Sequence, residues 1–243
     1  MKTILSAINL EVERIEAVDG TVMSEDELKG YVASLSDISK IICPRALSSG
    51  EVGAFLSHRK CWEKLVNSKE NWALIMEDDI QLSSQAKNYL SNSDWIPNGL
   101  DVIQLFVFRK RWKARVDRKE FRITTQVCLQ HPYKPSPIGA QAYFISRKAA
   151  EEALRLGREV MAPVDEFLFN PISDFARNFP VYRLNPAVVM PLDERFRSTI
   201  GVKRELYPYL KIIRYHPIRY IRQFQYRMKA FCFGREETFT YIP

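Results

Sequence analysis

The stretch from Glu51 to Asp79 constrains the fold of this chain more than any other. The turn residues 48–50 precede a segment in which apolar side chains recur at the spacing of one helix face, and polar residues 67–71 end that period. A short apolar run follows, residues 72–76, and three consecutive carboxylates come directly after it, Glu77, Asp78 and Asp79. The pattern predicts a helix, then a buried strand, with acid at the strand's carboxyl end.

The position of these carboxylates indicates a ligand site. In open α/β sheets, ligands bind at the carboxyl edge of the strands. Three adjacent carboxylates repel one another unless a cation or solvent neutralises them, and their hard oxygen atoms suit Mg²⁺ or Mn²⁺. Residue types alone leave two interpretations open, a divalent-metal site or a solvated acidic turn.

The rest of the chain reads as further strands and helices in alternation, which favours the α/β class. We expect strands at about 12–17, 101–108, 139–145, 181–184 and 187–190, and helices at about 24–34, 85–91, 147–156 and 161–168. Ser24 with Glu27 forms a capping box, and Ser146 and Gly157 bound the helix between them. Residues 109–122 are basic without a clear period, and the prolines of 131–137 predict irregular structure.

Composition excludes several classes of protein. Hydrophobic residues make up 46% of the chain and aromatic residues 12%, enough for a packed core. No apolar run approaches the roughly 20 residues that span a bilayer, and Glu11, Glu13 and Arg14 argue against a secretory signal. The four cysteines lack metal-site spacing, which predicts free thiols in a reducing compartment.

The formal net charge is +7 and is concentrated in two places. Residues 201–235 hold nine Lys or Arg against one acid, Glu205, mixed with many aromatic side chains, and residues 109–122 form a second basic cluster. Such a tail suits contact with an anionic membrane surface or with single-stranded nucleic acid, or a helix that lays its Lys and Arg stems over the core. Nothing else in the chain resembles a nucleic-acid-binding fold, so no nucleic-acid partner is expected.

Four stretches, in order, resemble glycosyltransferase family 25, the bacterial lipooligosaccharide galactosyltransferase family. They are AVDG at 17–20, GEVGAFLSH at 50–58 with WEK at 62–64, ALIMEDDI at 73–80, and GAQAYFISRK at 139–148 followed by PVD at 163–165. The likeness covers about residues 10 to 200. It implies a GT-A-like nucleotide-sugar-binding fold, a Rossmann-type α/β sandwich over residues 1–200, with 201–243 as a basic, aromatic C-terminal extension.

The resemblance also implies an activity. The expected reaction is inverting, metal-dependent transfer of a hexose, galactose, from a UDP-sugar to a lipopolysaccharide or lipooligosaccharide acceptor that is lipid-linked. The expected location is the cytoplasm, with peripheral contact at the inner membrane. About sixteen residues precede Ala17, fewer than the first strand and helix of other members need. Either the true start lies upstream, or this is a shortened member. The alternative function is that of a shortened, catalytically impaired member that acts as a binding protein.

Roles for individual residues follow from this chemistry. A divalent ion stabilises a leaving diphosphate, so we expect Asp79 and Glu77 to bind Mn²⁺ or Mg²⁺. Glu77 and Asp78 are also candidates to contact the ribose or sugar. Inversion requires a base for the acceptor hydroxyl, for which Asp165 is the first choice and Glu166 the second.

Other residues have weaker signals. Asp165 could instead cap its short helix, and His58 could hydrogen-bond the donor or brace the acidic loop. Ser57 has the same two possible roles as His58. Glu51 is grouped with the donor-binding residues and, with Gly53, is expected to shape the start of the helix. Further candidates for sugar contacts are Asp193 and Glu194; Tyr143 reads as packing, and His131 and His216 read as surface.

Overall fold

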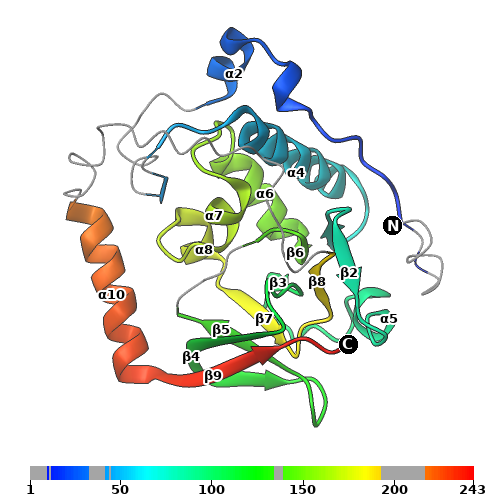
Figure 1. Cartoon of the computed structure of the whole chain (residues 1–243), viewed down its shortest axis with the longest axis vertical. Helices are drawn as coiled ribbons and strands as arrows, with labels where there is room; N and C mark the ends of the chain where they lie inside the picture. The colour runs from blue at the N-terminus through cyan, green and yellow to red at the C-terminus, as the bar shows by residue number, and fades with distance from the viewer. Residues whose placement is uncertain (1–9, 11, 33–41, 44, 134–138, 193–216) are drawn as a thin grey trace.

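The computed structural model describes residues 10, 12–32, 42–43, 45–133, 139–192 and 217–243. Within these ranges, seven strands form one sheet in the order β1-β6-β3-β7-β5-β4-β9, and β2 and β8 form a second (Figure 1). The strands are β1 Trp72–Met76, β2 Ile80–Leu82, β3 Val102–Gln104, β4 Arg111–Arg122, β5 Cys128–Pro132, β6 Ala142–Ser146, β7 Val181–Asn185, β8 Val189–Pro191 and β9 Gly234–Thr240. The helices are η1 Gly20–Val22, α2 Glu25–Tyr31, α4 Ser49–Asn67, α5 Lys87–Leu90, α6 Arg147–Leu156, α7 Val164–Phe169, α8 Asp174–Asn178 and α10 Pro217–Phe233.

The main sheet is mixed and mostly antiparallel, and helices pack on it, so the structure is a mixed α/β fold. The GT-A-like, Rossmann-type arrangement stays a prediction. Strands β3 and β7 are parallel, whereas the other neighbouring pairs of this sheet are antiparallel. Strands β1, β3 and β7 therefore run in one direction, and their carboxyl ends lie at the same edge. The acid after β1 does stand at this carboxyl edge.

The expectation that β1 is buried needs correction, because β1 is the edge strand and is only partly buried. Its side chains alternate between two apolar clusters, with Ile75 in one and Leu74 against the other. Both faces of the strand are covered, and among the described strands β1 pairs on one side only, with β6. A run covered on both faces is apolar throughout, so the sequence does not distinguish it from a central strand.

The two faces of the sheet bury different clusters. On one face, helices α4, α6, α7 and α8 pack over the sheet, as Figure 1 shows, and Tyr143 and Ile145 of β6 point into that cluster. Ala142 and Phe144, the alternate residues of β6, point into the cluster on the other face, which includes residues of α5. Strand alternation thus distributes one continuous apolar run over two cores.

Several expected boundaries are confirmed. Ser24 and Glu27 form the capping box of α2, and Ser146 caps α6, which ends at Gly157. The turn expected at 48–50 is wrong, because α4 already begins at Ser49. Ser48 is its cap: the Ser48 hydroxyl accepts from the Glu51 N–H, and the Glu51 carboxylate accepts from the Ser48 N–H at 2.8 Å.

The expectations for residues 12–17 and for residues 109–122 are wrong. Residues 12–19 form no strand, and Asp19 instead caps η1. The basic run 109–122 contains β4, whose side chains at Ala114 and Val116 are buried while its basic residues point outward. Those two small apolar residues are a weak signal among so many charges, so the strand depends on its neighbours β5 and β9.

One proline and one histidine also differ from the expectation. Pro132 ends β5, where it pairs with Val116, rather than lying in irregular chain. His131 is not a free surface residue, because its Nδ1 lies 2.8 Å from the Val181 carbonyl oxygen and burial lowers its pKa. His216 lies outside the described residues.

The C-terminal part combines a helix with a strand of the main sheet. Helix α10 extends along one side of the molecule and leads into β9, which pairs with β4 from Gly234 to Thr240 (Figure 1). The expected domain boundary at residues 200/201 lies outside the described residues and stays a prediction. Among the helices that the structure describes, none has both the length and the apolarity to cross a bilayer.

Candidate active site

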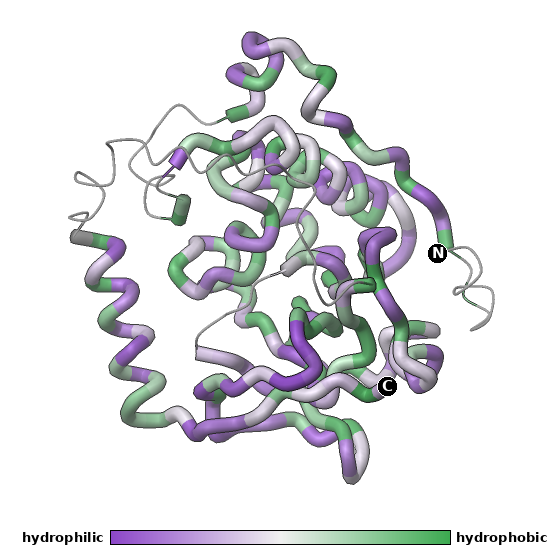
Figure 2. Tube along the Cα trace, in the orientation of Figure 1, coloured by the Kyte–Doolittle hydropathy of each residue, from purple (hydrophilic) through white to green (hydrophobic). Residues whose placement is uncertain are grey.

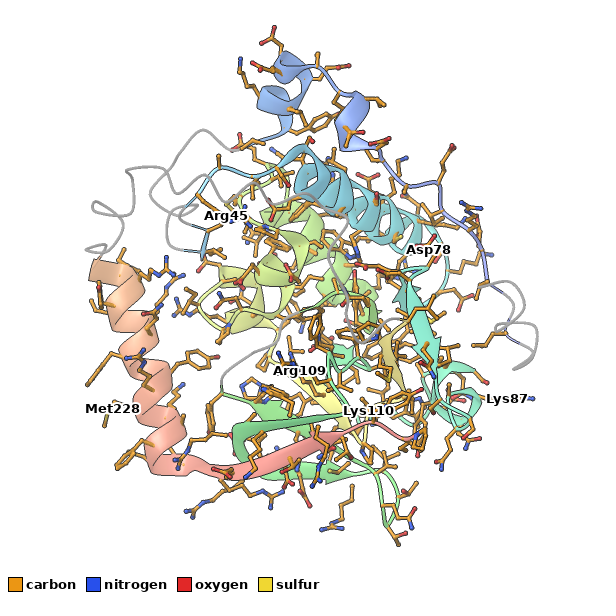
Figure 3. The ribbon with its side chains drawn as sticks, in the orientation of Figure 1. Arg45, Asp78, Lys87, Arg109, Lys110 and Met228 are labelled. Atoms are coloured by element: carbon orange, nitrogen blue, oxygen red, sulfur yellow. The ribbon has the colours of Figure 1, made fainter. Side chains whose placement is uncertain are left out.

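The three carboxylates lie where the chain passes from the main sheet to the second sheet. The Glu77 N–H donates to the Gln141 carbonyl at 2.9 Å, which continues the β1–β6 pairing by one residue. Asp78, labelled in Figure 3, is exposed, whereas Asp79 is half-buried. The Asp79 carbonyl accepts from the Leu192 N–H at 2.9 Å, so the end of β8 holds the acidic turn from the other side.

Asp79 has the features of a cation ligand. Its Oδ1 atom is buried and has no hydrogen-bond partner among the described residues. Burial raises the pKa of its carboxyl group, and the charges of Glu77 and Asp78 raise it further. A buried carboxylate oxygen without a donor is costly to leave unpaired, and a divalent ion would satisfy it.

The donor set around Asp79 is small. Among the described residues, no group of three or more His, Cys, Asp or Glu side chains is arranged to hold a metal ion. Mg²⁺ is commonly held by one or two carboxylates, with phosphate oxygens and water completing its coordination. Asp79 and Glu77 fit that pattern, while Asp193 and Glu194 lie outside the described residues.

A buried hydrogen-bond network connects α4 and β6 to Glu77. The Tyr143 hydroxyl lies 2.8 Å from Nδ1 of His58 and 3.0 Å from Nε1 of Trp62, and His58 Nε2 lies 3.4 Å from Oε1 of Glu77. All three rings are buried, Tyr143 and Trp62 completely. Burial raises the pKa of Tyr143 well above its usual value, so it remains a phenol.

The donor and the acceptor of each hydrogen bond in this network can be assigned. The Trp62 N–H can only donate, so the Tyr143 oxygen accepts it and the Tyr143 O–H donates to Nδ1 of His58. His58 then carries its proton on Nε2 and donates it to Glu77. The structure thus supports the bracing role that the sequence left open for His58, and Tyr143 does more than pack.

The second pair of carboxylates lies in the first turn of α7. Asp165 Oδ1 accepts from the Glu166 N–H at 2.8 Å, and Glu166 Oε2 accepts from the Asn170 amide at 2.5 Å. Asp165 does not occupy the cap position, which belongs to Pro163. Asp165 is therefore not the helix cap, and it contributes one hydrogen bond in the first turn.

The environment of Asp165 suits a base. Burial raises its pKa to about 6, with further contributions from the charge of Glu166 and then from Glu77 and Glu51. The pKa of Glu166 is also raised by burial. Since the charge of Glu77 acts on Asp165, the two acidic groups that are distant in sequence share one electrostatic environment.

Glu51 and Ser57 hold the N-terminal segment rather than face an open site. The Glu51 carboxylate forms an ion pair with Arg45 in addition to its capping bonds, and it is buried. The Ser57 hydroxyl accepts from the Val18 N–H and donates to the Gly53 carbonyl, both at 2.8 Å. A donor contact by either side chain stays a prediction.

Gly20 and Gly53 let the backbone of residues 18–20 lie close to the first turns of α4. A Cβ on Gly20 would lie 1.8 Å from the Ser49 carbonyl oxygen, and one on Gly53 would lie 2.5 Å from the Val18 carbonyl oxygen. Gly53 therefore shapes the start of α4, as expected, by allowing the backbone of residues 18–20 to come close. Sequence reasoning missed Arg45 and the hydrogen bonds of Trp62 and Tyr143, for which spacing along the chain offers no signal.

The fold is a mixed α/β fold in which two groups of carboxylates lie in half-buried surroundings. The family model described as glycosyltransferase family 25 (LPS biosynthesis protein) matches residues 1–168. This chain belongs to glycosyltransferase family 25.

Similar proteins come from bacteria and animals. The lipooligosaccharide biosynthesis protein lex-1 of Haemophilus influenzae is 28% identical over 59% of this chain and 50% of its own length. Procollagen galactosyltransferase 2 of Mus musculus is 27% identical over 75% of this chain and 31% of its own, and lic2B of Haemophilus influenzae is 24% identical over 66% and 63%. The chain therefore spans about half of lex-1, under a third of the procollagen galactosyltransferase and under two thirds of lic2B.

Proposed function

We propose that this chain is an inverting, metal-dependent glycosyltransferase that moves galactose from a UDP-sugar to a lipopolysaccharide or lipooligosaccharide acceptor. The observation that carries the proposal is the unpaired, buried Oδ1 of Asp79 beside Glu77, within a family of glycosyltransferases. The relatives named for lipooligosaccharide biosynthesis and for galactosyl transfer support the acceptor and the sugar. A GT-A-like arrangement, with the nucleotide at the carboxyl edge of the sheet, belongs to the same proposal.

The residues have the following proposed roles. Asp79 and Glu77 hold Mn²⁺ or Mg²⁺, which when bound neutralises the charge on the leaving diphosphate. His58 donates to Oε1 of Glu77 and fixes its orientation. Asp78, exposed beside them, is available to the ribose or the sugar.

Asp165 acts as the base. Its carboxylate takes the proton of the acceptor hydroxyl as that oxygen attacks the sugar from the face opposite the leaving group. A pKa of about 6 leaves Asp165 ionised at neutral pH and still basic enough to accept a proton. Glu166 is the second candidate for this role. The free cysteines fit the proposed cytoplasmic location.

The test combines binding with transfer. Purified chain is expected to show a rise in melting temperature with UDP and Mn²⁺ together that exceeds the rise with either alone. With UDP-galactose and a lipooligosaccharide core, it is expected to release UDP and form a product of inverted anomeric configuration, which nuclear magnetic resonance reports.

Two results would reject parts of the proposal. A product of retained configuration would remove the base mechanism of Asp165. No melting shift and no transfer, with acceptor binding intact, would instead support the alternative of a catalytically impaired binding protein.

A further inference from the structure

Helix α10 presents its apolar side chains to solvent instead of to the sheet. Ile221, Phe224, Met228 and Phe231 recur at helical spacing on one face, and they are 55%, 63%, 42% and 75% exposed. We call these four residues the outer stripe. Met228, labelled in Figure 3, points away from the sheet. A helix that packs by the hydrophobic effect would place these residues inward, so the outer stripe is not explained by the fold.

The inner face of α10 is the polar one. Arg222 donates to the Ile172 carbonyl at 2.7 Å and forms an ion pair with Asp174 at 2.8 Å. The other half-buried residues of α10 are Arg219, Gln223, Tyr226 and Ala230. Figure 2 shows hydrophilic and hydrophobic residues alternating along the helix. The polarity of α10 is thus inverted, and hydrogen bonds hold it against the body.

Basic residues flank the outer stripe. Arg227 and Lys229 are exposed beside it, and the sequence of α10 contains no acidic residue. Against a second copy of itself, this face would bring like charges together. Against single-stranded nucleic acid, Phe224 and Phe231 offer rings on which bases could stack, whereas Ile221 and Met228 do not, so only half of the stripe suits that partner. An apolar stripe between cationic borders matches the boundary of acyl chains and anionic headgroups.

We propose that α10 is an interfacial helix that docks this chain on an anionic lipid bilayer, with the outer stripe inserted among the acyl chains. Arg227 and Lys229 then lie at the level of the headgroups. The helix lies in the plane of the membrane and does not cross it, consistent with its length and charge. The proposal rests on α10 alone and is independent of the transfer reaction.

The test uses the full chain and vesicles of two compositions. We expect the protein to sediment with vesicles of phosphatidylglycerol mixed with phosphatidylcholine, to do so less as salt increases, and to bind phosphatidylcholine alone only weakly. A fluorophore on Cys232, the exposed cysteine of this chain, is expected to shift to the blue when the anionic vesicles are added. This readout needs no substitution in the helix.

Matched variants separate the contribution of the outer stripe from that of the basic residues. Replacing Phe224 and Phe231 together by Ser is expected to weaken vesicle binding roughly tenfold or more, while Val22→Ser, an equally exposed apolar position outside α10, leaves it unchanged. The pair Arg227→Gln and Lys229→Gln is expected to weaken binding by a similar factor at low salt. Its control is the pair Lys69→Gln and Lys87→Gln; Lys87 lies on the other side of the molecule (Figure 3).

Each of the following results would overturn the proposal. Binding to both vesicle compositions with equal affinity would remove the role of charge, and wild-type binding by the Phe224/Phe231 variant would remove the outer stripe. A doubled mass by light scattering that this variant abolishes would identify a second copy as the partner. Binding to a single-stranded oligonucleotide without binding to vesicles would identify nucleic acid. Since the substituted side chains are exposed, circular dichroism of the variants is expected to match the wild type.

Discussion

At the scale of single residues, the site depends on carboxylates in unequal surroundings. Asp78 is exposed, Asp79 is half-buried with an unpaired oxygen, and Asp165 has a pKa raised to about 6. Different surroundings give these carboxylates different pKa values. One carboxylate can therefore bind a cation while another moves a proton.

Replacing Asp79 by Asn is expected to abolish the melting shift that UDP and Mn²⁺ produce and to remove transfer. Because the folded-state pKa of Asp79 is raised, its ionised form destabilises the fold at neutral pH, and this penalty fades as the pH falls. In the absence of metal, the variant is therefore expected to be more stable than the wild type at pH 7 and equal to it in acid. Thermal unfolding across pH, with Asp94→Asn, an exposed carboxylate outside the site, as the control, measures both effects; a retained metal-dependent shift would contradict the assignment.

The raised pKa of Asp165 predicts where the acid limb of the pH–rate profile lies. Since its pKa is raised to about 6, kcat/KM is expected to fall as the pH decreases through this value, where the base becomes protonated. Asp165→Asn is expected to lower kcat by roughly 10²–10⁴-fold, and Glu166→Gln much less. An unshifted acid limb in the Asp165→Asn variant would assign the base elsewhere.

At the scale of elements, α4 connects the N-terminal segment to the acidic turn. Its first turns meet the backbone of residues 18–20, and its middle carries His58 and Trp62 to Tyr143 of β6. The helix therefore places both the glycine contact and the brace of Glu77 on one rigid support.

The glycine contact can be tested with a matched pair. Gly53→Ala adds a methyl group 2.5 Å from the Val18 carbonyl, so we expect loss of the N-terminal packing and a free energy of unfolding lower by about 1–3 kcal/mol. Gly30→Ala, in α2, meets no atom within 4 Å and is expected to be neutral or stabilising by up to about 1 kcal/mol. Equal effects in denaturant unfolding would exclude the steric explanation.

The brace of Glu77 can be tested at Tyr143. Tyr143→Phe removes the hydroxyl that pairs with Trp62 and His58, and it leaves two buried nitrogen atoms without a partner. We expect a loss of about 1–3 kcal/mol in the free energy of unfolding. Tyr133→Phe, which removes one hydrogen bond to Asp117, is the comparison and should cost less. A neutral Tyr143→Phe would show that water replaces the network.

At the scale of the whole molecule, the sheet requires residues far beyond the family match. The match ends at residue 168, yet β7 lies beside β3 and β9 forms the far edge against β4. Phe239 of β9 is buried and stacks on Trp112 of β4 with ring centroids 5.1 Å apart. Its apolar cluster includes Val107 and Ala187, which joins three distant parts of the chain.

This packing predicts a single unfolding unit. Phe239→Ala is expected to lower the free energy of unfolding by about 3–5 kcal/mol in one cooperative transition. Phe231→Ala, on the exposed face of α10, is expected to have little effect. A separate, weaker transition for the C-terminal part in calorimetry would show that residues 201–243 are an independent extension, as the sequence suggested.

Local chemistry explains which parts of the fold could be predicted. The helix from Arg147 to Leu156 was delimited by its cap and its glycine, and the strand before Glu77 by its apolar run, because neighbours in sequence determine both. Strand β4 escaped detection because its order comes from β5 and β9. The same holds in the site: the acid of Glu77 to Asp79 was visible in sequence, whereas the brace from Trp62 through Tyr143 was not.

The sequence by itself determined that this chain has a helix and an apolar strand leading into three carboxylates, and that four motifs place it near one family of enzymes. Only the tertiary structure decided that this strand lies at the sheet edge, that Asp79 keeps an unpaired oxygen, and that α10 turns its apolar face outward. The physical reason is that apolar periodicity and caps are local, whereas burial, pairing and electrostatic environment depend on segments that meet only when the chain has folded.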